Sequence, residues 1–129
     1  MDIICKHISI CDDDLGCQVI FSNKPDLGEE IEGISLREIV DSIGEYLLLQ
    51  RTYSEFDFGE DNYYFETHDE NLIGKLEAFE IVMSKQSFEL QFGFEIIKIS
   101  MNPTDQEFVD LKRVLPILIN KRGKFSINE

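Results

Sequence analysis

Acidic and aromatic side chains are interleaved in the middle of this chain, and that combination is suited to binding a basic protein. From Thr52 to Gly74 the chain holds seven Asp or Glu residues and no Lys or Arg. Carboxylates attract cationic side chains, and aromatic rings supply the apolar contacts that dominate protein interfaces. A solvated loop without a partner is the alternative for this segment. We expect a partner-binding surface formed by Tyr53, Phe56, Asp57, Phe58, Glu60, Asp61, Asp69 and Glu70.

The chain offers few residues for proton transfer or nucleophilic catalysis. It has two histidines, His7 and His68, and neither lies beside a serine or cysteine in a recognisable catalytic motif. The Asp-Phe-Gly sequence at 57–59 lacks every companion motif of the kinases. We therefore expect no enzymatic activity, no catalytic residue and no cofactor.

The acidic and cysteine patterns do not match known metal motifs. The run 12–14 lacks the alternating ligand spacing of an EF-hand loop. Cys5, Cys11 and Cys17 are too widely spaced for the usual zinc pairs, and their odd number gives no disulfide framework. We expect reduced thiols and no metal site. A domain whose acidic loops bind a divalent cation or a small ligand is the alternative function.

Charge is unevenly distributed along the 129 residues. The chain has 26 Asp and Glu against 12 Lys and Arg, a formal net charge of −14, yet residues 112–129 hold five bases and one acid. An acidic body repels nucleic acid and anionic membranes and attracts basic proteins; acidity that serves only solubility is the alternative. The sequence shows no secretory signal and no membrane span, so we expect one cytoplasmic domain over 1–129, with homo-oligomerisation left open.

The elements that must position these residues are mostly strands. Alternating apolar residues and turn signals predict about six or seven strands in an antiparallel sheet. The expected strands cover 2–10, 19–21, 45–52, 63–66, 76–84, 88–92 and 97–101. We also expect a turn at 12–16, a loop at 22–33, and a bulge near Ile96. Most aromatic residues in strand patterns, Phe94 among them, are expected in the core.

Two capping boxes predict two helices. The first, at 35–38, precedes apolar residues at helical spacing and predicts a short helix over 36–43. The second, at 104–107, predicts a C-terminal helix packed on the sheet, with Lys112 and Arg113 complementing its C-terminal dipole. Pro116 should kink or end this helix near Val114 or Leu115. The expected fold class is α+β.

The segments 46–51 and 64–71, followed by Gly74 and the strand through Glu80 and Ile81, resemble one family of bacterial immunity proteins. These proteins belong to polymorphic toxin systems, and the similarity is to immunity protein family ten, over roughly residues 44–119. The resemblance implies an α+β inhibitor that neutralises a toxin. Together with the charge, it leads us to expect a non-enzymatic protein that binds a cognate basic toxin domain.

Arg51 calls for a separate interpretation because it is the only base between residues 38 and 74. We expect a structural role for it, in an ion pair with a carboxylate on a neighbouring strand such as Glu66.

Overall fold

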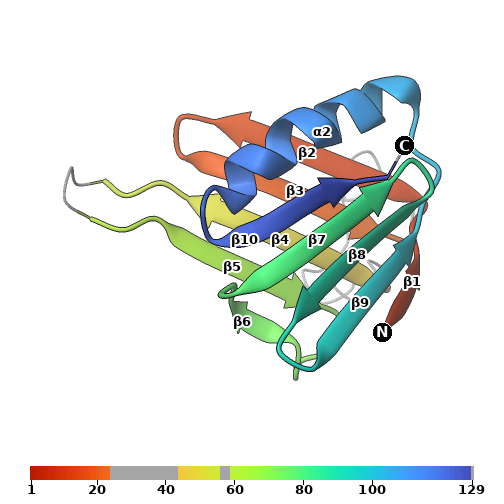
Figure 1. Cartoon of the computed structure of the whole chain (residues 1–129), viewed down its shortest axis with the longest axis horizontal. Helices are drawn as coiled ribbons and strands as arrows, with labels where there is room; N and C mark the ends of the chain where they lie inside the picture. The colour runs from red at the N-terminus through yellow and green to blue at the C-terminus, as the bar shows by residue number, and fades with distance from the viewer. Residues whose placement is uncertain (24–43, 56–58, 129) are drawn as a thin grey trace, which may run out of the picture.

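A computed structural model of the chain describes residues 1–23, 44–55 and 59–128. The expected helix over 36–43 and most of the expected loop over 22–33 lie outside these residues. In the described part the fold consists of two five-stranded sheets and one helix (Figure 1). This arrangement is broadly consistent with the expected α+β class, but it has ten described strands and two sheets where we expected six or seven strands in one.

Sheet A is built mainly from the second half of the chain. Its strands, in spatial order, are β1 (Asp2–Ile4), β9 (Glu95–Ser100), β8 (Ser87–Phe92), β7 (Phe79–Ser84) and β10 (Gly123–Ile127). The three middle strands pair antiparallel, whereas β1 pairs parallel with β9 and β10 pairs parallel with β7. The sheet is therefore mixed, which corrects the purely antiparallel expectation.

Sheet B is an antiparallel meander from the first half of the chain. Its strands, in spatial and sequence order, are β2 (His7–Asp13), β3 (Gly16–Ser22), β4 (Tyr46–Thr52), β5 (Asn62–Thr67) and β6 (Ile73–Lys75). β4 is the central strand, as its apolar sequence predicted. The remaining described element is α2 (Asp105–Ile119), which contacts β10 of sheet A and β2, β3 and β4 of sheet B.

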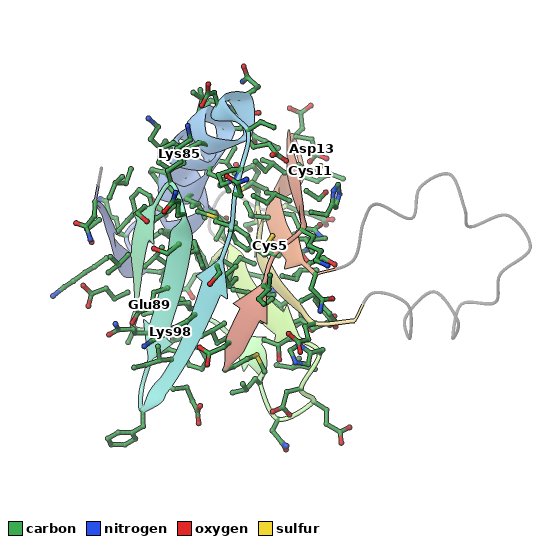
Figure 2. The ribbon with its side chains drawn as sticks, turned by 90° about the vertical axis from the view of Figure 1, so that its right-hand side faces the viewer. Cys5, Cys11, Asp13, Lys85, Glu89 and Lys98 are labelled. Carbon is green, nitrogen blue, oxygen red and sulfur yellow. The ribbon has the colours of Figure 1, made fainter. Side chains whose placement is uncertain are left out.

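The core lies between the inner faces of the two sheets. Because side chains alternate across a strand, the central strands bury one set of alternate residues, as for Leu47 and Leu49 on β4. Ring contacts join the sheets: the centroids of Phe21 on β3 and Phe88 on β8 lie 4.5 Å apart. Figure 2 shows Glu89 and Lys98 on one outer side of the molecule and Cys11 and Asp13 on the other.

The expected single strand over 2–10 is two strands that belong to different sheets. Ile3 and Cys5 are buried at odd positions, whereas Ile8 is buried at an even position. A continuous strand cannot bury both sets on one face, since alternation has a period of two. The chain therefore leaves sheet A after Ile4 and enters sheet B at His7.

The expected bulge near Ile96 is wrong, because the chain reverses there. β8 and β9 form a hairpin whose register is unbroken from Ser87 opposite Ser100 to Phe92 opposite Glu95. The turn uses Gly93 at φ 58°, a conformation that favours glycine, followed by Phe94. Phe94 is consequently fully exposed at the tip of the hairpin, not in the core as we expected.

Helix α2 begins as predicted but ends later. The Thr104 side chain accepts a hydrogen bond from the Glu107 backbone N–H at 3.1 Å, and the Glu107 carboxylate accepts one from the Thr104 N–H at 2.9 Å. The helix runs past Pro116 to Ile119, because Leu118 and Ile119 bury their side chains in the core while Pro116 faces solvent. That burial outweighs the lost backbone hydrogen bond.

The later helix end also changes the expected role of two bases. Lys112 and Arg113 lie in the middle of α2, and no base occupies its last turn. The expected stabilisation of the C-terminal dipole by these residues is therefore wrong.

Candidate partner-binding site

Two acidic loops from separate parts of the sequence meet at one end of sheet B. The turn between β2 and β3 is linked to the start of the β4–β5 connection by a hydrogen bond from the Tyr53 N–H to the Leu15 carbonyl, 2.9 Å long. Both loops project from the same side of the fold in Figure 1. We call this surface the acidic end of sheet B and define it by Asp12, Asp13, Asp14, Leu15, Tyr53, Glu55, Glu60 and Asp61.

The β2–β3 turn is rigid because Asp13 organises its backbone. One Asp13 carboxylate oxygen accepts hydrogen bonds from the N–H groups of Leu15, at 2.8 Å, and Gly16, at 3.2 Å. Leu15 is held outward and is 77% exposed. This turn was expected from its sequence, but its position beside the aromatic segment was not, since only the register of β3 and β4 brings them together.

Arg51 links the acidic end to the rest of the fold. Its Nε and Nη2 atoms lie 2.8 and 2.7 Å from Oδ2 of Asp61, and Nη1 donates to the Ile117 carbonyl at the end of α2. Its guanidinium also lies over the Tyr53 ring, 4.9 Å from the centroid. The expected pairing with Glu66 is wrong: Arg51 points to the inner side of sheet B with Leu49, whereas Glu66 points outward.

Three of the carboxylates at the acidic end have a cationic partner within the protein. Asp61 pairs with Arg51, Asp12 pairs with Arg113 of α2 at 3.0 Å, and Glu60 lies 3.6 Å from Arg122. The other three described carboxylates, those of Asp13, Asp14 and Glu55, form none of the ion pairs found in the described part of the chain. The surface therefore retains an excess of negative charge.

The residues expected to bind a partner do not form one continuous patch. Tyr53, Glu60 and Asp61 belong to the acidic end, whereas Asp69 and Glu70 follow β5 at its opposite end. A six-residue strand separates the two groups by roughly 20 Å. Phe56, Asp57 and Phe58 lie outside the described residues. Asp61 is also less available than expected, because the Ser54 N–H and Arg51 already donate to its carboxylate.

A shallow hollow of about 270 Å³ opens beside the acidic end. It lies over β2, β3 and β4, and Gly16 is one of its lining residues. The other lining residues are Cys11, Asp13, Leu15, Cys17, Gln18, Gln50, Arg51 and Thr52. Such an open depression is suited to one side chain of a partner and would not enclose a substrate.

The outer face of sheet B carries a second group that sequence reasoning missed. Tyr46 and Tyr64 both donate hydrogen bonds from their hydroxyls to the Glu66 carboxylate, at 2.6 and 2.7 Å. We had read Tyr46 and Tyr64 only as strand residues. In the structure, buried and half-buried residues alternate along 46–52 and 62–67, which places both tyrosines on the outer face. The unbroken apolar run at 47–49 gave no such alternation in the sequence.

In residues 1–23, 44–55 and 59–128, no three His, Cys, Asp or Glu side chains are grouped as a metal site requires. All three cysteines are free, with Cys5 and Cys17 buried and Cys11 exposed. Across the same residues, no helix combines the length and apolar character needed to cross a membrane.

Comparison with known proteins returned no match: no family model, no curated protein and no solved structure matches this chain.

Proposed function

We propose that this chain is a non-enzymatic cytoplasmic immunity protein that binds a basic bacterial toxin domain and blocks it. The observation that supports this proposal best is the acidic end of sheet B. There, two loops distant in sequence present six described carboxylates against three arginine partners, around the exposed Leu15 and the half-buried Tyr53. The sequence resemblance described for segments 46–51 and 64–71 points to the same proposal, although no family model matches the chain.

The acidic end would act first on the rate of association. A surplus of carboxylates raises the local concentration of a basic partner, and steering of this kind speeds encounter by roughly 10- to 1,000-fold at low salt. Leu15, fixed outward by the Asp13 hydrogen bonds, then offers an apolar contact at little cost in conformational entropy. Inhibition would follow from covering the catalytic surface of the toxin, with no chemical step by the immunity protein.

The first experiment asks whether the chain binds a toxin at all. The purified protein is titrated by isothermal calorimetry into a basic toxin domain, taken from an adjacent gene where one is encoded, and toxin activity is assayed in parallel. We expect saturable binding with 1:1 stoichiometry and loss of toxin activity at the same ratio. Absence of binding would refute the proposed function.

The second experiment asks whether the acidic end steers association. The variant Asp14→Lys/Glu55→Lys changes two exposed carboxylates at this end, and Asp2→Lys/Glu95→Lys makes the same change in net charge on sheet A. We expect the association rate at low salt to fall by about tenfold in the first variant and by less than twofold in the second. Equal reductions would mean that net charge alone, not this surface, governs encounter.

A further inference from the structure

We propose that the outer face of sheet B binds an arginine side chain of the protein partner at Glu66, between Tyr46 and Tyr64. This inference rests on the proposed function for the identity of the partner. The binding group itself is argued from the geometry of three side chains on β4 and β5. We call Tyr46, Tyr64 and Glu66 the tyrosine–carboxylate cluster.

The cluster is held in place before any partner arrives. Each oxygen of the Glu66 carboxylate accepts one tyrosine hydroxyl, Tyr46 on Oε2 and Tyr64 on Oε1. Tyr46 is fixed in turn by its backbone N–H, which donates to Nδ1 of His68 at 3.2 Å. Because all three side chains are half-buried on strands, little freedom remains to be lost on binding.

Glu66 forms none of the ion pairs found among the described residues, although it is only half exposed to water. Each of its oxygens uses one lone pair for a tyrosine and keeps another, so the carboxylate can still accept two parallel N–H bonds. Burial and the bond to Glu66 both raise the pKa of the Tyr46 hydroxyl, and the bond to Glu66 raises that of Tyr64. The two hydroxyls therefore remain donors at neutral pH.

The ligand that fits this arrangement is a guanidinium group. Its planar fork can donate two hydrogen bonds to one carboxylate, and its faces stack on tyrosine rings. An ammonium group lacks both features. Arginine and tyrosine are also the residues that most often carry binding energy at protein interfaces.

The surroundings of the cluster favour a protein over a small ligand. In the strand register Glu66 lies between Leu48 and Ile73, and Leu48 lies next to Ile20. These three apolar side chains point to the outer face together with Gln50, which lies opposite Tyr64. Lys75, opposite Tyr64, also lies on this face, but it forms no ion pair with Glu66 among those found in the described residues. A face with apolar, amide and tyrosine groups around a carboxylate resembles the centre of a protein interface.

The position of the cluster also explains how both groups of expected residues could serve one partner. Glu66 precedes the turn that carries Asp69 and Glu70, while the acidic end lies at the other end of β5. A typical interface buries about 800 Å² on each protein, a patch about 30 Å across. One partner lying on the outer face of sheet B would therefore reach both ends.

The test compares Glu66→Gln with Glu89→Gln, a matched change on the outer face of sheet A, where Glu89 is also half-buried on a central strand. Binding of the same toxin domain is measured by calorimetry. We expect the dissociation constant to rise at least tenfold for Glu66→Gln and by less than twofold for Glu89→Gln. If the wild type binds and Glu66→Gln binds equally well, the inference is wrong while the proposed function stands.

A second probe does not depend on the toxin. N-acetyl-arginine amide is titrated into the isotope-labelled protein, and backbone amide shifts are followed by NMR. We expect saturable shifts at millimolar ligand centred on Tyr46, Leu48 and Glu66, absent in Glu66→Gln and weaker with the lysine analogue. Absence of these shifts in the wild type would overturn the inference even if the toxin bound.

Two further measurements identify other occupants of this face. A change in the oligomeric mass of the free protein on Glu66→Gln substitution would assign the face to a second copy of the chain. A large fall in melting temperature for Tyr46→Phe/Tyr64→Phe with unchanged toxin affinity would assign it to intramolecular packing. Either result would overturn the inference.

Discussion

Arg51 on β4 and Asp61 at the end of the β4–β5 connection form an ion pair in which the guanidinium Nη2 and the carboxylate Oδ2 are 2.7 Å apart. The side chains are 16% and 21% exposed, so the pair is largely shielded from water. It ties the connection to the central strand of sheet B, and the bond from Arg51 to the Ile117 carbonyl ties both to α2.

Replacement of Arg51 should destabilise the fold. Arg51→Ala leaves the Asp61 carboxylate with one fewer charged donor and the Ile117 carbonyl without its arginine bond, for which we expect a loss of about 3 kcal/mol in the free energy of unfolding. Arg51→Lys keeps the positive charge but lacks the planar guanidinium with its several N–H donors, so we expect about half of that loss in unfolding free energy. Urea denaturation measures both, and Lys98→Ala on the outer face of sheet A is the control. A loss below about 0.5 kcal/mol for Arg51→Ala would contradict this role.

The Asp61 carboxyl should make stability depend on pH in the acidic range. The N–H of Ser54 and the guanidinium of Arg51 donate to it, and they lower its pKa below the ordinary value of 3.8. A folded-state pKa below the unfolded one adds stability that is complete above about pH 4 and is lost as pH falls through the folded value. Asp61→Asn should therefore flatten the decline in unfolding free energy between pH 5 and pH 2. Asp14→Asn, which removes a carboxylate outside the described hydrogen bonds, should leave that decline unchanged.

Two glycines with the same backbone angle should respond differently to substitution. Gly16 and Gly74 have φ values of 155° and 157°. A Cβ on Gly16 would overlap the Arg51 carbonyl oxygen of the paired strand, whereas a Cβ on Gly74 meets no atom within 4 Å. We expect Gly16→Ala to cost about 2 kcal/mol more than Gly74→Ala in thermal or chemical unfolding. Equal losses would mean that β3 and β4 can separate without penalty.

The three thiols should differ in reactivity. Burial raises the pKa of Cys5 and of Cys17, and both side chains are shielded in the core, whereas Cys11 is exposed on β2. Because the thiolate is the reactive form, we expect one thiol per native molecule to react with a disulfide reagent at least about tenfold faster than the others. Cys11→Ser should remove this fast phase. Three equally fast thiols would contradict the burial of Cys5 and Cys17.

Local patterns in the sequence were enough to predict several elements. The central strand β4, the strand β5 and the start of α2 at Thr104 all follow from alternation or capping within a few residues. The parallel pairs of β1 with β9 and β10 with β7 were missed, since they join segments far apart in the chain. Nothing in a local pattern states which distant strand is the neighbour.

The site was less predictable than the fold because it depends on register. Arg51 could be recognised as a structural base, but Glu66 and Asp61 were both available as partners. Arg51 lies opposite Tyr63 on β5, and both side chains point to the inner face. Glu66 lies opposite Leu48, and both of these side chains point to the outer face. The same alternation places the tyrosine–carboxylate cluster outside and could not be assigned until the pairing was known.

The division of the two sheets along the chain has a consequence for synthesis. All strands of sheet B lie within residues 7–75, whereas four of the five strands of sheet A lie within 79–127. During translation the meander of sheet B can leave the ribosome with Phe21, Leu47 and Leu49 still uncovered, until β7, β8 and β9 have been made. The nascent chain thus passes through a stage in which one face of sheet B exposes apolar side chains to solvent. At that stage chaperone binding or aggregation would compete with folding.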